Sequence, residues 1–286
     1  LEISELKDII NSLETKFGFE QNIEITLETT PQNITSENLI GWKSIGINRI
    51  SIGIQTLNDK SLKEIGRFNN KISLNALNEI KNSKFDNINL DFIIGLPHTK
   101  KGEIKENIEF ILNNYNFIKH ISVYMLEDHY YSFKNSLKDE DYLGEYNEIR
   151  NFLEKKGFNF YELSNSSKVG YECKHNKAYW NHSEMLAFGL GAHGFINSKR
   201  FSYSSNFSGF YENKIEEEIL GENDLFLEKI MFDIRTSGID KKLIEKLNKK
   251  NILEFIKSGF LEIKEDKLIL TAKSYTLVDF IIKEII

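Results

Sequence analysis

Short apolar runs alternate with amphipathic stretches along the first part of the chain. Helical spacing of apolar residues begins near the first residue and continues to Phe17, and it returns over residues 36–45, 74–82, 103–114 and 142–156. The apolar runs between these stretches predict strands at residues 23–28, 49–55, 88–94 and 120–126, with a weaker fifth strand at residues 159–163. The pattern therefore predicts an α/β fold in which strands and helices take turns.

Strands that are joined by helical crossovers pair in parallel, because each crossover returns the chain to the same end of the sheet. We expect both faces of such a sheet to be covered, which would explain apolar runs such as Ile93-Ile94 in place of strict alternation. An open doubly wound sheet and a (β/α) barrel both fit this order. No Gly-x-Gly-x-x-Gly follows the first strand, so the dinucleotide-binding form of the open sheet has no support.

Polar residues at the strand ends favour the barrel. The first two strands end in Glu28 and Gln55, the third carries Asp91, and Glu127 follows the fourth. The carboxyl ends of parallel barrel strands converge on one mouth, where binding sites are built. Arg67, after the second strand, can pair with a carboxylate through two hydrogen bonds. We expect these side chains to form a polar ring that can bind hydroxyl groups, an amino group or a metal. The alternative is that they are ordinary polar residues of loops.

The character of the chain changes near residue 224. Helical patterns at residues 225–235, 241–247 and 252–257 precede two apolar runs, at residues 260–263 and 268–270, and a last helical pattern at residues 272–286. Helices followed by a two-stranded wing predict a small winged-helix-like module. Its 12 Lys and Arg stand against 11 Asp and Glu, so we expect a packing lid or a protein contact and not a DNA-reading surface.

Charge and composition exclude several classes of protein. The formal net charge of −6 argues against nucleic acid as the main partner, because no basic excess is available to neutralise phosphates. No apolar run approaches the roughly 18 residues of a transmembrane segment, and no signal peptide is visible. The single cysteine, Cys173, rules out an internal disulfide, and this fits a cytoplasmic location.

Residues 173–180 read Cys-Lys-His-Asn-Lys-Ala-Tyr-Trp. This segment brings potential metal ligands and aromatic residues closely together in the sequence. Cys173 stands two residues before His175, and Tyr179 and Trp180 follow. Imidazole and thiolate are both ligands of heme iron, and aromatic rings offer apolar planes to a porphyrin. The alternative is structural: His175 caps a loop and Trp180 belongs to the core.

Zinc is a weaker hypothesis for the histidines of this region. His175, His182 and His193 follow no common structural zinc spacing, and no cluster of carboxylates or thiols completes four ligands beyond Cys173.

Several short motifs fall in one order over nearly the whole chain, and together they resemble the radical S-adenosylmethionine enzymes of the coproporphyrinogen dehydrogenase group. The motifs are Glu28-x-x-Pro31, residues 48–55 (Asn-Arg-Ile-Ser-Ile-Gly-Ile-Gln), Gly66-Arg67, residues 91–97 (Asp-Phe-Ile-Ile-Gly-Leu-Pro), His120-Ile121-Ser122-x-Tyr124, residues 161–165 (Tyr-Glu-Leu-Ser-Asn), His175-Asn176-x-x-Tyr179-Trp180, residues 189–193 (Gly-Leu-Gly-Ala-His) and residues 235–239 (Arg-Thr-Ser-Gly-Ile). The His-Asn-x-x-Tyr-Trp element is similar to the HemW branch, the heme chaperones, and is absent from the HemN dehydrogenases.

The resemblance implies a (β/α)6 barrel that binds S-adenosylmethionine at its mouth. Relatives contact this cofactor from the positions that match Glu28, Gln55, Arg67 and Asp91, and less strongly from those of Glu127 and His193. In the heme-chaperone branch, the resemblance implies His175 as the ligand of heme iron, Cys173 as a candidate second ligand, and Tyr179 and Trp180 beside the porphyrin.

This chain also departs from the relatives. At the edges of the site, the residues usual in the relatives are replaced by Thr30, by Asn69 and by the run His98-Thr99-Lys100. These replacements affect only the expected orientation of the cofactor. The Cys-x-x-x-Cys-x-x-Cys loop and the Gly-Gly-Thr turn of the relatives are not in this sequence. Three thiolates hold a [4Fe–4S] cluster, and Cys173 alone does not suffice. We therefore expect an N-terminally incomplete, partial barrel without its first two strands, with the cluster in the intact protein only.

These observations predict three parts: residues 1–163 as the partial barrel, residues 164–223 as the heme motif with a connecting segment, and residues 224–286 as the winged-helix-like module. The leading hypothesis is a heme chaperone that delivers heme to an unknown acceptor protein, with no catalytic residue assigned in this chain. An oxygen-independent coproporphyrinogen III dehydrogenase, which carries out an oxidative decarboxylation, is the alternative. A degenerate remnant with a scaffolding role is a third hypothesis.

Overall fold

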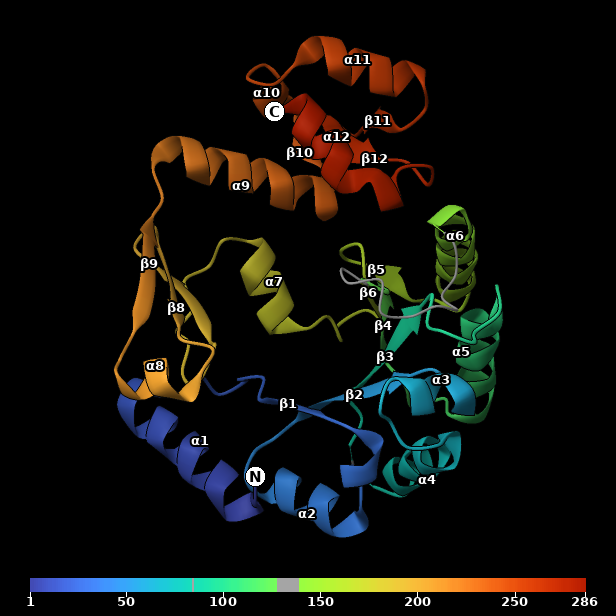
Figure 1. Cartoon of the computed structure of the whole chain (residues 1–286), viewed down its shortest axis with the longest axis vertical. Helices are drawn as coiled ribbons and strands as arrows, with labels where there is room; N and C mark the ends of the chain where they lie inside the picture. Colours follow the sequence, from blue (N-terminus) through green and yellow to red (C-terminus); the bar gives the residue numbers. More distant parts are fainter. Residues whose placement is uncertain (84, 128–138) are drawn as a thin grey trace. The chain divides into compact units, whose positions relative to one another are not determined.

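The computed structural model describes residues 1–83, 85–127 and 139–286 (Figure 1). The chain divides into two compact units, Leu1–Glu172 and Cys173–Ile286, called the first and the second unit below. The division into three parts that the sequence suggests stays a prediction.

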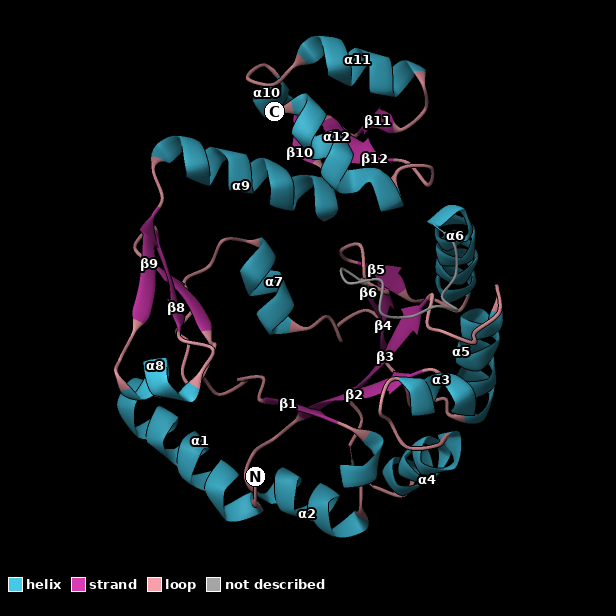
Figure 2. Cartoon of the chain, viewed as in Figure 1, coloured by secondary structure: helices cyan, strands magenta, loops and turns pink. Residues whose placement is uncertain are grey.

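The first unit is a mixed α/β sheet with helices, so the predicted fold class is confirmed at this level. Its elements are α1 (Ile3–Phe17), β1 (Thr26–Thr29), η1 (Pro31–Asn33), α2 (Ser36–Ser44), β2 (Arg49–Gln55), α3 (Asp59–Glu64), α4 (Asn70–Lys81), β3 (Ile88–Ile94), α5 (Glu103–Asn114), β4 (His120–Met125), α6 (Asp139–Lys155), β5 (Asn159–Phe160) and β6 (Asn165–Ser167). The strand order is β1-β2-β3-β4-β6-β5 (Figure 2). Strands β1 to β4 are parallel, as predicted, whereas β6 runs antiparallel to both β4 and β5.

Strand β2 and the first parts of β3 and β4 alternate between apolar residues and polar residues or glycine, whereas β3 ends in the continuous apolar run Phe92-Ile93-Ile94. One face carries apolar side chains that are at most 2% exposed: Ile50, Ile52, Ile54, Leu90, Phe92, Ile121 and Val123. Helices α2, α4, α5 and α6 lie along the outer side of this sheet (Figure 1). The other face carries polar side chains such as Ser51, Asn89 and His120, which are also buried. Only one face therefore belongs to the hydrophobic core.

Side-chain caps set where two of these helices begin. The Oγ1 atom of Thr35 accepts a hydrogen bond from the backbone N–H of Asn38 at the start of α2. The side chain of Asn58 accepts from the N–H groups of Lys60 and Ser61 at the start of α3. Each cap satisfies N–H groups that have no partner within the helix, which stabilises the first turn of α2 and of α3.

The second unit contains two small antiparallel sheets. Its elements are α7 (Lys174–Trp180), β7 (His193–Ile196), β8 (Lys199–Tyr203), α8 (Phe207–Tyr211), β9 (Ile215–Ile219), α9 (Glu222–Arg235), β10 (Ile239–Asp240), α10 (Lys241–Ile244), α11 (Lys249–Lys257), β11 (Leu261–Lys264), β12 (Lys267–Leu270), η2 (Tyr275–Leu277) and α12 (Val278–Ile285). The strand orders are β7-β8-β9 and β10-β12-β11. The second sheet contains the predicted hairpin, whose turn residues Glu265 and Asp266 both have positive φ. The first sheet was not predicted.

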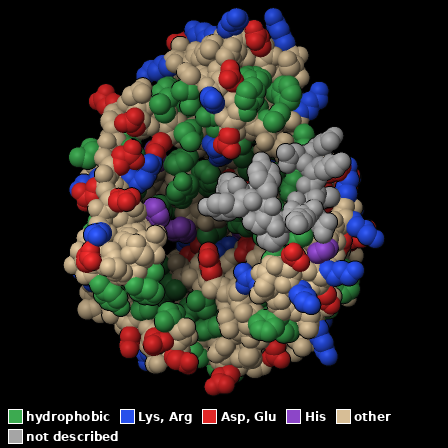
Figure 3. Space-filling view, in the orientation of Figure 1, with side chains coloured by type: hydrophobic (Ala, Val, Ile, Leu, Met, Phe, Trp, Pro, Cys, Tyr) green, Lys and Arg blue, Asp and Glu red, His purple; other side chains and the backbone are tan. Residues whose placement is uncertain are grey.

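The surface carries charges of both signs. On the face seen in Figure 3, acidic and basic side chains are interspersed and no large basic patch is visible. No helix in the described part of the chain combines the length and the apolar character that a membrane crossing requires.

Glu145 of α6 is a buried carboxyl group with few partners. Its Oε1 atom accepts a long hydrogen bond (3.4 Å) from the N–H of Ile104 near the start of α5. Its Oε2 atom has no hydrogen-bond partner within the described ranges. Burial raises the pKa of Glu145 from 4.5 to about 7, with smaller contributions from the charges of Glu148 and Glu103.

Replacing Glu145 with Gln should remove a pH-dependent loss of stability. Because the pKa is raised in the folded state, the native protein keeps a proton that the unfolded chain releases, and stability falls as the pH rises from 4.5 to about 7. We expect Glu145→Gln to match the parent near pH 5 and to exceed its free energy of unfolding at pH 8 by on the order of 1 to 3 kcal/mol. Urea unfolding at both pH values measures this. Exposed Glu14→Gln is the control, and an effect of Glu145→Gln that is equal at both pH values would contradict the prediction.

Candidate functional site

Two rows of mostly polar residues cross the polar face of the six-stranded sheet. Strand register aligns the first row as Glu28, Ser51, Asn89, His120 and Ser167. The second row, one step closer to the carboxyl ends of the parallel strands, is Gly53, Asp91, Ser122 and Asn165. Because side chains on one face are two residues apart along a strand, both rows point the same way. The strand register therefore builds a polar surface next to the apolar core.

The amide of Asn89 is the centre of a hydrogen-bond network on this face. Its Nδ2 atom donates to Ser51 Oγ and to Asp91 Oδ1, both at 2.7 Å. Its Oδ1 atom accepts from Ser122 Oγ at 3.1 Å and lies 2.6 Å from His120 Nδ1. One side chain thus uses both donor hydrogens and both acceptor positions, and it joins strands β2, β3 and β4.

His120 and Asp91 are the two titratable groups of the network. His120 is fully buried, and burial lowers its pKa to about 3, with a further contribution from the charge of Arg49. It is therefore neutral near pH 7, and its Nε2 atom lies 2.7 Å from the hydroxyl of Tyr161. Burial raises the pKa of Asp91 although Ser122, Asn89 and Ser51 oppose this, and the charge of Glu28 raises it further. Asp91 and Glu28 thus lie within electrostatic reach of each other.

Gln55 ends β2 in an unusual backbone conformation. Its φ is 68°, in the left-handed region that non-glycine residues rarely adopt, and the strand register shifts between Gly53 and Gln55. A Cβ atom on Gly53 would lie only 2.6 Å from Gln55 Nε2, so the glutamine side chain folds back over the glycine. Gly53 is paired with Asp91 across the sheet. The structure therefore brings Glu28, Gln55 and Asp91 together at the carboxyl ends of β1, β2 and β3.

The other residues predicted for this site take more peripheral places. Arg67 is exposed and lines a narrow hollow of about 10 Å³ together with Pro31 and Gly53, at the end of β2. In the described ranges, Arg67 makes no ion pair. Glu127 is exposed and follows β4. His193 begins β7 in the second unit, also with an exposed side chain.

The heme-motif residues lie on and next to α7. Cys173 is the N-cap residue and is 4% exposed, whereas the side chain of His175 is exposed. Residues two apart on a helix do not face each other, so the thiol and the imidazole point to different sides. Tyr179 follows His175 by four residues, on the same face of the helix, and is 44% exposed. An accessible imidazole and an accessible aromatic ring therefore share one face.

A cluster of four rings supports the end of α7. The ring of Phe232, from α9, is at the centre, with ring centroids 5.1 Å from Tyr179, 5.3 Å from Trp180 and 4.7 Å from His182. Sequence reasoning identified Tyr179 and Trp180 but missed Phe232, because a phenylalanine in an amphipathic helix is an ordinary core residue. It considered His182 only as a zinc ligand. No local pattern signals a contact between residues about 50 positions apart.

The ligand atoms of these side chains determine which cofactors the residues could bind. Cys173 is the only cysteine of the sequence, and the described residues contain no group of three His, Cys, Asp or Glu side chains that could hold a metal ion. This chain therefore does not itself fit a [4Fe–4S] cluster, and the zinc hypothesis has no support. The carboxylates of Glu28 and Asp91 and the amide of Gln55 fit a ligand rich in hydroxyl and amino groups. The exposed face of α7 fits heme.

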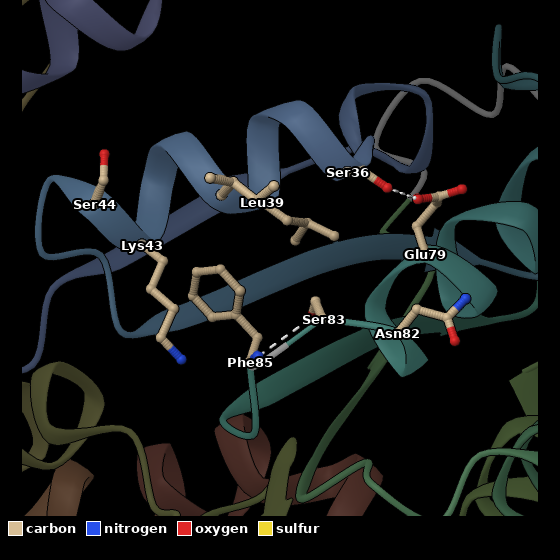
Figure 4. A pocket seen from close by; sticks show the side chains of 9 residues that line it. Ser36, Leu39, Lys43, Ser44, Glu79, Asn82, Ser83 and Phe85 are labelled. Carbon is tan, nitrogen blue, oxygen red and sulfur yellow. Dashed lines mark hydrogen bonds between the residues drawn. The ribbon is translucent and has the colours of Figure 1, made fainter.

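A larger hollow of the first unit lies elsewhere. Side chains of α2, of α4 and of the turn after α4 line this space of about 480 Å³, with Leu39 and Phe85 as apolar parts of its wall (Figure 4). The Lys43 amino group lies 5.4 Å from the centroid of the Phe85 ring, and Ser36 donates a hydrogen bond to Glu79. None of the residues that the sequence predicts for a cofactor or heme site lines this hollow.

Comparison with known proteins shows what the chain is similar to. Residues 1–111 match the model of the radical SAM superfamily. The chain is 32% identical to the heme chaperone HemW of Buchnera aphidicola from Acyrthosiphon pisum, over 91% of this chain and 74% of that protein. It is 28% identical to the heme chaperone HemW of Lactococcus lactis, over 97% and 79% of the two chains. Among solved structures, coproporphyrinogen III oxidase (HemN) from Escherichia coli aligns with a TM-score of 0.81 at 17% identity, covering 99% of this chain and 74% of that chain.

Replacing Asn89 with Leu should destabilise the fold more than an ordinary surface change. The substitution leaves buried groups of Ser51, Asp91 and His120 without their partner, and each such loss costs about 1 to 3 kcal/mol. We expect the free energy of unfolding to drop by about 3 kcal/mol or more, measured by chemical denaturation. Asn82→Leu, on the exposed end of α4, is the matched control, and similar losses for the two variants would show that the network contributes little.

Proposed function

Because the chain belongs to the HemW family of radical S-adenosylmethionine proteins, we propose that it is a heme chaperone that binds heme and delivers it to an acceptor protein. The observation that carries this proposal is the exposed face of α7. His175 is accessible there, and Tyr179, one helical turn later, presents a ring that Phe232 and Trp180 support from behind. His175 is the proposed ligand of the iron. Tyr179 and Trp180 offer apolar area to the porphyrin.

Cys173 is left out of the proposed heme site. Its thiol is buried and lies on a different side of α7 from His175, so the two side chains do not converge on one iron atom in this structure. The second axial ligand therefore has to come from a different residue, from solvent or from the acceptor protein.

We also propose that the polar face of the first unit binds S-adenosylmethionine. Glu28 and Asp91 would accept hydrogen bonds from the ribose hydroxyls or the amino group, and Gln55 can donate or accept. Arg67 would pair with the methionyl carboxylate, and Glu127 would make a weaker contact. His193 belongs to the second unit, and its contact with the cofactor stays a prediction from the family resemblance. In radical enzymes this cofactor supplies radical chemistry together with a [4Fe–4S] cluster. This chain does not contain the three thiolates of such a cluster, so no catalytic step is assigned to it.

Two finer features of the fold belong to the same proposal. The four parallel strands β1 to β4 are interpreted as consecutive strands of a (β/α)6 barrel, which places their carboxyl ends at its mouth. Residues 224–286 are interpreted as a winged-helix-like module, with β11 and β12 as the wing. The likeness to coproporphyrinogen III oxidase is one of fold alone, and the His175–Trp180 element favours the chaperone over the dehydrogenase.

Replacing His175 with Ala should abolish most of the heme binding. Removing the imidazole removes the bond to iron but leaves the aromatic rings, so we expect the affinity to fall about tenfold or more. Titration of the full chain with hemin, followed in the Soret band, measures this. His98→Ala, an exposed histidine of the first unit, is the control. Cys173→Ser should bind like the parent. If His175→Ala binds as tightly as the parent, the ligand assignment is wrong.

Replacing Asp91 with Ala should weaken the binding of S-adenosylmethionine. A lost hydrogen bond between a carboxylate and the ligand costs about tenfold or more in affinity, measured by isothermal titration calorimetry on the full chain. Because Asp91 also accepts hydrogen bonds within the sheet, Glu28→Gln serves as a second variant with an exposed side chain. Exposed Glu64→Ala is the control. Parent-like affinity in both site variants would refute the assignment.

A further inference from the structure

His182 closes the C-terminal end of the heme-motif helix in a backbone conformation that is uncommon for residues other than glycine. Its φ is 56°, and its N–H donates to the carbonyl of Tyr179 at 3.0 Å. The N–H of Ser183 donates to the carbonyl of Ala178 at 2.9 Å. This pair of hydrogen bonds is the Schellman closure, in which glycine or asparagine usually stands at the left-handed position. A histidine at this position costs backbone energy, so its side chain is expected to compensate.

The imidazole of His182 has a partner on three sides. Its Nε2 atom lies 2.7 Å from Glu228 Oε2, on α9. Its ring stacks on Phe195 of β7 at a centroid distance of 5.4 Å and an interplanar angle of 21°. It meets Phe232 edge-on at 4.7 Å. The side chain of His182 thus contacts strand β7 and helix α9.

Glu228 is held in turn by a cation. Arg200 of β8 forms an ion pair with Glu228 and a second one, at 3.0 Å, with Glu218 of β9. Burial lowers the pKa of His182, and the charges of Arg200 and Lys229 lower it further, against the opposing charge of Asp233. A neutral imidazole next to a carboxylate, which only accepts, donates its Nε2 hydrogen. The orientation of the ring is therefore fixed by charge as well as by packing.

The same contacts reach the residues of the proposed heme face. Phe232 touches His182 and also Tyr179 and Trp180, so the orientation of these two rings depends on where His182 holds Phe232. Resting on the proposed heme-binding function, we propose that His182 and Glu228 are positioning residues that set the aromatic face on which the porphyrin lies next to His175. They act through Phe232 and Tyr179 and do not contact the iron.

The test uses the full chain and two variants that remove the contact in different ways. His182→Asn keeps a residue that tolerates positive φ but removes the ring. Glu228→Gln keeps the shape of the side chain but removes its charge. We expect each variant to bind hemin about fivefold to tenfold more weakly, because it loses a charge-assisted hydrogen bond. The double variant should bind no more weakly than His182→Asn, since both residues act through one contact.

The saturated ferric complex supplies a readout that a purely structural role would not change. A displaced porphyrin alters the geometry of the bond between iron and His175, so the Soret and visible bands of both variants should shift. Glu217→Gln is the matched control. It removes the ion pair with Lys199 on the same small sheet, without touching the ring cluster, and should leave affinity and spectrum unchanged.

The outcomes separate this inference from the proposed function. Parent-like affinity and spectrum in both variants overturn the positioning role, while a loss of binding in His175→Ala still supports heme binding. A lower melting temperature with an unchanged spectrum at saturation also overturns it, because His182 would then be only structural. Absence of heme binding by the parent overturns both. If His182→Asn does not fold, Glu228→Gln, which conserves side-chain shape, decides alone.

Discussion

The buried amide of Asn89 is the constraint on which the first unit depends. A parallel sheet with helices on one side needs something other than an apolar layer on its second side if that side is to bind a polar ligand. Asn89 provides this by satisfying Ser51, Asp91, Ser122 and His120 at once. Buried polar groups are tolerated only when they are paired, so the network allows a polar surface to lie directly behind the hydrophobic core.

Much of this sheet could be predicted from the sequence, because its signals are local. Strands β2 and β3 and helix α5 begin and end where the apolar pattern predicts, and Glu28, Gln55 and Asp91 lie on three neighbouring parallel strands. Strand β6 was missed since Asn-Ser-Ser has no strand character of its own; its pairing with β4 comes from the hydrogen bonds of Asn165 and Ser166 across the sheet. The left-handed conformation of Gln55 was also hidden, because it depends on the space that Gly53 leaves.

The second unit was less predictable for a related reason. Sheet β7-β8-β9 carries exposed ion pairs between strands, such as Lys199 with Glu217 at 2.9 Å, and its strands lack a regular apolar alternation that would mark them in the sequence. The segment around His175 could be identified from its residue types and from its resemblance to a family. The residues that support this segment could not be identified in that way, because Phe232, Glu228 and Arg200 are distant in sequence and belong to no motif. Candidate ligand residues within one short segment can be identified from the sequence. The distant residues that orient them are identified only from the three-dimensional structure.

Strand β9 has a consequence for how copies of this protein behave in solution. It lies at the border of its sheet, all five of its residues are exposed, and three of them are consecutive glutamates, Glu216 to Glu218. An uncovered border offers main-chain hydrogen bonds to any passing strand, including the same strand of another molecule. Two such borders brought together would set carboxylate against carboxylate. Mutual repulsion between these carboxylates therefore disfavours self-association through β9, whereas a strand with basic residues can still pair with this edge.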